Sequence, residues 1–319
     1  MTGPGPASTG SVPETAPLVS VVIPTRGRPA LLLETLASIT AQDYAGPLEI
    51  IVVHDREECD PTLARLSGPN REIVSMVNTR TGGLCGARNT GVLASRGAFV
   101  ASCDDDDLWY PGKVRLQVER LLADPSLLAV GAGIRLLMGE RGNVDWQARE
   151  ELISHERLLE NRVKELHSST LMMRRSAFDE AGLYDEELPH SYGEDYDWLL
   201  RASRVGRVGA VTEILADIRK DVPSWFRERS LNTATALEYL LHKHPDFRDR
   251  RRGHARILGQ IAYARAAAGE RGRSARIAGR ALRVYPASTH AWLALAVAGP
   301  GIEPRRMLSA ARRFGRGLS

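Results

Sequence analysis

Four consecutive aspartates, residues 104–107, are the part of this sequence that most directly indicates chemistry. They follow an apolar, strand-like run, 97–103, and precede the segment Leu-Trp-Tyr-Pro at 108–111. Two carboxylates about 4 Å apart repel by about 1 kcal/mol in water and by several times that in a protein cleft. A positive charge is therefore expected among them, and a divalent cation bound by carboxylate oxygens is its simplest source. The sequence thus predicts a metal-assisted reaction.

The elements that would position these aspartates alternate between strands and helices. Apolar runs predict buried strands at 18–23, 48–53, 72–77 and 98–103, and helical spacing predicts helices at 30–40, 61–66 and 87–95. This alternation indicates a mostly parallel sheet with helices on both faces, a Rossmann-like α/β fold. Ligands of such sheets lie at the carboxyl ends of the strands. Thr25, Asp55 and the four aspartates all follow predicted strands, so we expect them to meet at one edge.

The rest of the chain divides into a second α/β part and a helical part. Helices are predicted at 113–123, 150–165, 175–181 and 193–205, and strands at 127–137, 171–173 and 208–216. From residue 229 onward the pattern is helical throughout, and 262–286 resembles one helix pair of the tetratricopeptide type, which is not an array. We therefore predict a disordered tail at 1–16, a catalytic domain at 17–225 and a basic, all-helical C-terminal appendage at 226–319.

Composition narrows the location of the protein. No apolar run approaches the ~20 residues of a membrane span, and the Gly/Pro/Ser-rich start has no basic and apolar secretory signal. Three cysteines form no disulfide framework. These features predict a protein of the reducing cytoplasm.

The charge is unevenly distributed along the chain. The whole chain carries +4, but residues 248–319 hold 16 arginines against three acids, which leaves the first 247 residues net acidic. This basic end suggests peripheral contact with anionic lipids at the inner face of the membrane. The candidate side chains are Arg305, Arg306, Arg312, Arg313 and Arg316. A solvated arginine-rich helix surface is the alternative, and no motif predicts a nucleic-acid partner.

Several segments occur in an order that resembles a known family. They are 19–28, 50–55, 86–91 (Gly-Ala-Arg-Asn-Thr-Gly), 104–111, 182–186 and 193–198 (Gly-Glu-Asp-Tyr-Asp-Trp). Together they resemble an inverting glycosyltransferase of family 2 with the GT-A fold, over 17–221 of the chain. The resemblance implies transfer of a sugar from a nucleotide diphosphate sugar to a hydroxyl acceptor on a polysaccharide, a glycolipid or a glycosylated metabolite.

The resemblance also implies a metal site that holds Mg²⁺ or Mn²⁺ through oxygen ligands. Asp106 is expected to be the main ligand, with Asp104 beside it, while Asp104 and Asp105 lie near the ribose and the diphosphate. Asp107 is expected to support the ligands. Many members place a histidine in a Tyr-Arg-x-His segment near the end of the catalytic domain; here Asp221 occupies that position, and it is the third candidate ligand.

Further residues are assigned to the donor by the same resemblance. Pro24 and Thr25 are expected to contact the nucleoside, and Arg28 and Arg88 are assigned to donor binding as well. Asp55 matches the carboxylate that binds the base of the nucleotide. A UDP-sugar is the favoured donor. His54 replaces the aspartate that usually precedes this carboxylate, however, which weakens the assignment of the base as uracil and leaves the base open.

Inversion at the sugar carbon requires one base, which removes the proton from the acceptor hydroxyl. The resemblance places this role on Asp195, with Glu194 beside it at the start of a predicted helix. Two adjacent carboxylates at a helix N-terminus gain from the helix dipole, and their repulsion raises one pKa. His167 and His190 are not assigned to catalysis.

Other function classes remain open at this point. A phosphatase would place its paired aspartates after the first strand, and a nucleotidyltransferase would have a glycine-rich, basic first loop, so the sequence fits both poorly. The non-enzymatic alternative is a catalytically inactive GT-A-like protein that binds carbohydrate or acts as a scaffold.

Overall fold

The computed structural model describes residues 16–220 and 230–299 of the chain. The strands are β1 Val19–Thr25, β2 Leu48–His54, β3 Arg71–Val77, β4 Phe99–Ser102, β5 Leu108–Trp109, β6 Leu127–Leu137, β7 Val144–Trp146, β8 Leu152–Ile153, β9 Met172–Arg174 and β10 Arg207–Arg219. The α-helices are α1 Pro29–Thr40, α2 Leu84–Ala94, α3 Lys113–Ala123, α4 His155–Glu160, α5 Ala177–Glu180, α6 Glu194–Val205, α7 Ser230–Lys243, α8 Arg251–Ala267, α9 Arg271–Val284 and α10 Thr289–Ala298. Short 3₁₀ helices include η1 Pro61–Leu66, η3 Lys164–Leu166, η4 Ser168–Thr170 and η6 Pro245–Asp249.

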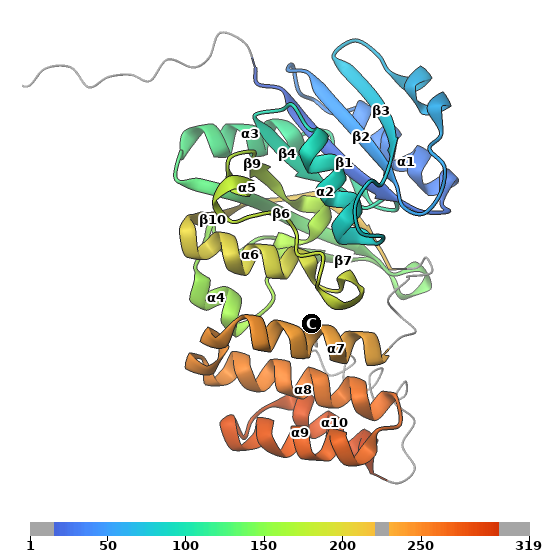
Figure 1. The fold of residues 1–319 in the computed structure, drawn as a ribbon. Helices are drawn as coiled ribbons and strands as arrows, with labels where there is room; N and C mark the ends of the chain where they lie inside the picture. Colours follow the sequence, from blue (N-terminus) through green and yellow to red (C-terminus); the bar gives the residue numbers. More distant parts are fainter. Residues whose placement is uncertain (1–15, 221–229, 300–319) are drawn as a thin grey trace, which may run out of the picture.

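One mixed sheet organises the first two thirds of the described residues (Figure 1). Its strand order is β3-β2-β1-β4-β9-β6-β10-β5, with β7 paired to β6 and β8 paired to β10. β1 runs parallel to both β2 and β4, and β9 is antiparallel to β4 and β6. The predicted sheet is confirmed, and the carboxyl ends of β1, β2 and β4 lie at one edge.

The sheet separates two apolar cores because side chains alternate along its strands. Val21 and Ile23 of β1 pack in one core with residues of α1 and α3. Val22, which points the other way, packs in a second core with residues of α2, α5 and α6. Trp198 of α6 is fully buried in this second core.

The predicted all-helical region is confirmed over 230–299 by α7–α10, which stack beneath the sheet in Figure 1. Residues of α7 and α8 join the second core of the sheet, whereas α8, α9 and α10 also form a small core of their own. None of the described helices is both long and apolar enough to cross a bilayer.

Some predicted elements are wrong in detail. The predicted single helix at 150–165 is instead β8, α4 and η3. Leu152 and Ile153 pair with β10, Ser154 caps α4 by accepting the Arg157 N–H at 3.1 Å, and α4 ends before Asn161. Residues 61–66 form a 3₁₀ helix, and the helix predicted at 175–181 is reduced to α5. Asp221, the C-terminal arginines 305–316 and the predicted disordered residues 1–15 lie outside the described residues.

Candidate active site

The four aspartates form a turn, the four-aspartate turn, directly after β4. The Asp107 N–H donates to the Asp104 carbonyl at 3.3 Å, which closes the turn. The Cys103 N–H donates to the Val22 carbonyl at 3.1 Å, which anchors it beside β1. The turn therefore begins at the carboxyl edge of the sheet, where the sequence predicted it.

The last residue of β1, Thr25, and Arg28, which follows the strand, contact the middle of this turn. The Thr25 hydroxyl donates to Asp105 Oδ2 at 2.8 Å, and Arg28 Nη1 lies 3.2 Å from Asp105 Oδ1 and 2.7 Å from Asp106 Oδ2. Burial raises the pKa of Asp105 to about 6 against the opposing effects of Thr25 and Arg28. Burial and the neighbouring Asp104 likewise raise the pKa of Asp106. Arg28 therefore contacts both carboxylates, but its charge does not fully offset the effect of burial on the pKa of either one.

Arg88 connects the four-aspartate turn to the start of α6. It is 1% exposed, and its Nη2 donates to Asp104 Oδ1 at 2.5 Å while its Nη1 lies 3.2 Å from Glu194 Oε1. Burial opposes charge on both partners, but the ion pair prevails: the pKa of Arg88 is raised and that of Asp104 is lowered. The Ser168 hydroxyl donates to the other Asp104 oxygen at 3.0 Å. Asp104, a predicted metal ligand, and Glu194, the neighbour of the predicted base, thus share the buried Arg88.

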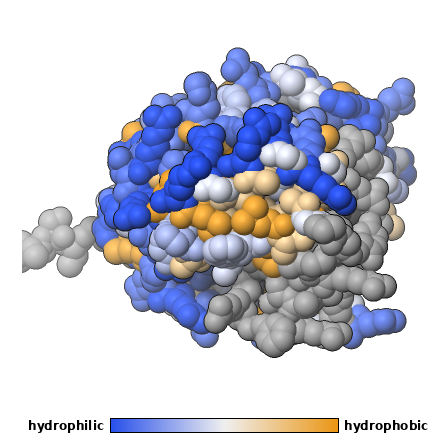
Figure 2. Space-filling view, turned by 90° about the horizontal axis from the view of Figure 1, so that it is seen from below, coloured by the Kyte–Doolittle hydropathy of each residue, from blue (hydrophilic) through white to orange (hydrophobic). Residues whose placement is uncertain are grey.

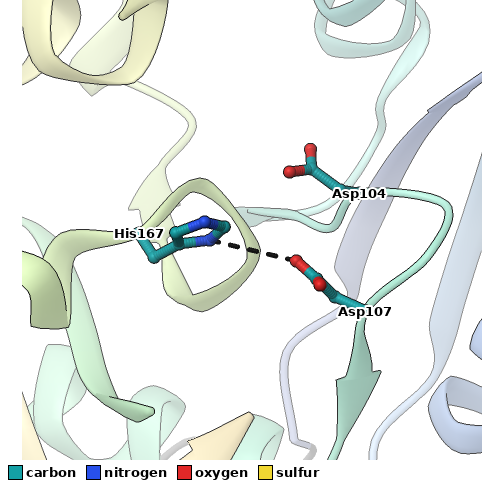
Figure 3. Close-up of side chains that lie close together, drawn as sticks. All are labelled: Asp104, Asp107 and His167. Carbon is teal, nitrogen blue, oxygen red and sulfur yellow. Dashed lines mark ion pairs between the residues drawn. The ribbon is translucent and has the colours of Figure 1, made fainter. Parts of the chain in front are cut away.

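His167, which sequence reasoning left aside, lies against the turn (Figure 3). Its Nδ1 is 3.9 Å from Asp107 Oδ2 and accepts the Ser169 N–H at 3.2 Å, so Nδ1 carries no proton. Burial, followed by the charge of Lys220, lowers the pKa of His167 to about 4. One oxygen each of Asp104 and Asp107 and one nitrogen of His167 lie within 4.8 Å of one another. The sequence signal for His167 is weak: it lies just before β9, the strand that pairs with β4.

This group fits a divalent cation by its chemistry. It offers carboxylate oxygens, which hard cations prefer, and one neutral imidazole nitrogen. Burial, and after it the charges of Asp104 and Asp106, raise the pKa of Asp107 well above its usual range. Asp106 contacts Arg28 and is not one of the three clustered groups.

Asp55 ties the end of β2 to the loop that precedes α2. Its Oδ1 accepts the Asn78 side-chain amide at 2.8 Å and the Gly83 N–H at 2.9 Å. Gly83 has φ of 122°, a conformation that favours glycine. His54 uses both ring nitrogens inside the protein: Nδ1 lies 3.2 Å from Glu57 Oε1, and Nε2 faces the Ser75 hydroxyl at 3.1 Å. Pro24 lies within β1, next to Thr25.

The two carboxylates that begin α6 have opposite environments. Both oxygens of Asp195 accept from Arg162 Nη2, at 2.8 and 2.7 Å, and Oδ1 also accepts the Tyr196 N–H at 2.7 Å. Burial opposes ionisation of Asp195, but Arg162 lowers its pKa overall. Burial raises the pKa of Glu194 to about 7 in spite of Arg88. The pair therefore holds one fixed charge and one group that titrates near neutrality.

Comparison with known proteins supplies independent findings. The sequence model of glycosyl transferase family 2 matches residues 20–182, just over half of the chain. An uncharacterized glycosyltransferase of Rickettsia typhi is 29% identical over 64% of this chain, and the match covers 64% of that relative's own length. The uncharacterized glycosyltransferase YwdF of Bacillus subtilis is 31% identical over 60% of this chain and 70% of the relative.

Solved structures resemble nearly the whole chain. Residues 1–349 of S. aureus TarS in complex with UDP-GlcNAc align with a TM-score of 0.55 and 16% identity, over 94% of this chain and 93% of that one. The mannosyltransferase PcManGT from Pyrobaculum calidifontis, in complex with GDP-Man and Mn²⁺, aligns with a TM-score of 0.51 and 19% identity, over 98% and 85%. At such identities the likeness shows a shared fold.

Proposed function

The chain belongs to glycosyl transferase family 2 and has the GT-A fold, and on that premise we propose that it is a metal-dependent, inverting glycosyltransferase. It would move a sugar from a nucleotide diphosphate sugar to a hydroxyl acceptor. The observation that carries the proposal is the contact of Arg88 with both Asp104 and Glu194. This contact supports the proposal, because Asp104 is a candidate metal ligand and Glu194 is the neighbour of the candidate base, Asp195.

The donor would bind at the carboxyl edge of β1 and β2. Thr25, Arg28 and Asp105 are already connected there, and Asp55 orders the adjacent loop. Arg88 Nε has no hydrogen-bond partner among the described residues, so it is a candidate donor to a phosphate oxygen. Solved structures of similar fold hold UDP, UDP-GlcNAc or GDP-Man, and we favour a UDP-sugar for this chain.

A Mg²⁺ or Mn²⁺ ion would be held at the four-aspartate turn. Asp104 and Asp106 are the ligands that the family resemblance implies, and the geometry adds Asp107 and His167. Asp221 lies just outside the described residues, directly after Lys220, and stays a predicted ligand. A bound divalent ion neutralises the negative charge that develops on a diphosphate leaving group.

Asp195 would remove the proton from the acceptor hydroxyl. Its lowered pKa keeps it ionised near neutral pH, and an ionised carboxylate is the form that accepts a proton. Arg162 occupies both of its oxygens, so the acceptor hydroxyl would have to replace one of these contacts. Glu194, with a pKa of about 7, would lie next to it as a second titrating group.

The acceptor would be a hydroxyl of a polysaccharide, a glycolipid or a glycosylated metabolite. A cytoplasmic location and contact of the basic C-terminal arginines with the inner membrane face belong to the same proposal. The alternative, an inactive carbohydrate-binding or scaffold protein, is less favoured because Asp104 and Asp195 both have cationic partners, the buried Arg88 and the partly exposed Arg162.

Turnover of a donor panel tests the proposal. UDP-, GDP-, dTDP- and CDP-sugars are incubated with the protein, with Mn²⁺ or with EDTA, and release of nucleoside diphosphate is measured. We expect release from one nucleotide class, only with the metal. Two variants distinguish the ligand that the resemblance implies, Asp106, from the one that the geometry adds, Asp107. The essential ligand is the one whose replacement, Asp106→Asn or Asp107→Asn, abolishes turnover. No release from any donor by the wild-type protein would favour the inactive alternative.

A further inference from the structure

A third carboxylate of α6 has its partners in the helical appendage. Asp197 is 0% exposed and lies two residues after Asp195. Its Oδ1 is 2.8 Å from Lys243 Nζ and 2.9 Å from His244 Nε2, and its Oδ2 is 3.0 Å from the Arg201 guanidinium. Lys243 is the last residue of α7, and His244 follows it. The first turn of α6 is therefore fixed from the appendage.

Lys243 also reaches the loop that faces α2. Its Nζ donates to Asp185 Oδ2 at 2.5 Å, and the same oxygen accepts the Tyr239 hydroxyl at 2.8 Å. The next residue, Glu186, accepts the side-chain amide of Asn89 at 2.7 Å. Asn89 directly follows Arg88 in α2. The end of α7 thus contacts α6 directly and α2 through one loop.

His244 has a defined tautomer at this junction. It is buried, and its Nδ1 accepts from Arg204 Nη2 at 2.9 Å, so the ring proton lies on Nε2 and is donated to Asp197. Burial opposes ionisation of Asp197, but His244, Arg201 and Lys243 hold its pKa well below the usual range. Asp197 needs these partners to stay ionised, because Glu194 and Asp195 lie in the same turn of α6 and repel its charge.

We propose that Lys243 and His244 are positioning residues for the transfer reaction. They would hold the first turn of α6 so that Asp195 and Glu194 face the four-aspartate turn. The inference rests on the proposed function, since it assigns the base to α6. A displacement of about 1 Å in a reacting group lowers a rate by about 100-fold, so loss of this support would act on kcat.

Matched variants test this role. Lys243→Met removes a cation that contacts Asp197, and Arg250→Met removes one from an exposed ion pair, 3.5 Å long, with Glu156 of α4. We expect Lys243→Met to lower kcat by about 10- to 100-fold, with the KM for the donor and the affinity for UDP and Mn²⁺ unchanged. Arg250→Met should leave all of them unchanged. His244→Gln, whose amide can both donate and accept, should keep most of the activity that His244→Leu loses.

Hydrogen exchange gives a readout that does not depend on turnover. Lys243→Met should accelerate exchange of the amides at the start of α6 and leave those of β1 and β2 unchanged. Unchanged exchange in α6, or a fall in kcat that is matched by a loss of UDP affinity, would overturn the positioning role. A wild-type protein without turnover would contradict the proposed function, while the exchange result would still decide whether the junction fixes α6.

A separate observation concerns the outer end of the appendage, formed by α9 and α10. Figure 2 shows an apolar strip there between hydrophilic side chains. Trp292 of α10 is 57% exposed, and Leu282 and Leu295 are only partly buried. On α9 the exposed residues include Arg273, Arg276, Arg280 and Arg283. This end therefore has an apolar surface without a partner among the described residues.

Discussion

The four-aspartate turn and the first turn of α6 are both acidic, but they differ in how their charge is balanced. In α6, Asp195 pairs with Arg162, while Asp197 pairs with Arg201 and with Lys243, which also contacts Asp185; the pKa values of Asp195 and Asp197 are both lowered. In the four-aspartate turn, Asp105 and Asp106 share Arg28, and their pKa values are raised. Both regions are largely buried, so burial alone does not explain the difference.

The difference separates carboxylates that the protein itself balances from those that suit the proposed cation. Removal of one partner from a buried ion pair strongly destabilises a fold, because the other charge is left uncompensated. A group of carboxylates with too few cations favours binding of an added cation. Asp107 shows this most clearly, because its pKa is raised well above the usual range by burial and by its neighbours. Glu194, which shares Arg88 with Asp104, lies between the two cases.

The largest expected effect comes from removing the proposed base. Asp195→Asn should lower kcat by about 10²- to 10⁴-fold, because a general base contributes about that much. Its affinity for UDP and Mn²⁺, measured by calorimetry, should stay at the wild-type value. If the variant kept its kcat and Glu194→Gln lost it, Glu194 would be the base instead.

Breaking a fixed ion pair should act on stability. Asp197→Asn removes a fully buried carboxylate that the partly buried Lys243 and Arg201 share. The free energy of unfolding should fall by about 3–5 kcal/mol, as for other broken buried pairs. Urea denaturation of the metal-free protein measures it. A change below about 1 kcal/mol would show that the pairing in α6 is not structural.

An Asp→Asn substitution in the four-aspartate turn should affect metal binding and leave stability almost unchanged. Asp107→Asn replaces a carboxyl whose pKa is already raised, so the metal-free protein should unfold within about 1 kcal/mol of the wild type. Its affinity for Mn²⁺ should fall by about 10- to 100-fold, in the range measured for lost supporting groups of metal sites. Equal losses of stability for Asp107→Asn and Asp197→Asn would remove the distinction between the two regions.

A smaller effect is expected in the pH dependence of stability. The pKa of Glu194 is raised from 4.5 to about 7, so the folded protein favours its protonated form. Its contribution is fully present below about pH 4.5 and is lost as the pH rises through 7. Wild type should therefore lose stability relative to Glu194→Gln between these values. Parallel curves for the two proteins, from denaturation at a series of pH values, would contradict the raised pKa.

Much of the fold was predictable because local patterns and tertiary structure agree. The runs at 113–123 and 127–137 became α3 and β6 with the predicted bounds, since the helical and strand patterns there are regular. The segment 150–165 was not predictable from periodicity, because pairing of β8 with β10 and capping by Ser154 depend on distant residues or on a single side chain.

The site was predictable only where its residues follow strands. The association of Thr25 with Asp105 follows from the parallel pairing of β1 with β4, which brings their carboxyl ends together. The position of His167 beside Asp107 follows from η4 and β9, which no periodic pattern connects to the turn. The partners of Asp195 and Asp197, Arg162 and Lys243, come from a loop and from a separate helix.

Thermal unfolding with UDP and Mn²⁺, added alone and together, tests the central claim that the four-aspartate turn awaits an exchangeable cation. At about 100 times its dissociation constant, UDP with Mn²⁺ should stabilise the wild type by about 2.7 kcal/mol. UDP alone should give a clearly smaller shift, and Asp104→Asn should show no added effect of the metal. Equal stabilisation by UDP with and without Mn²⁺ would contradict the claim.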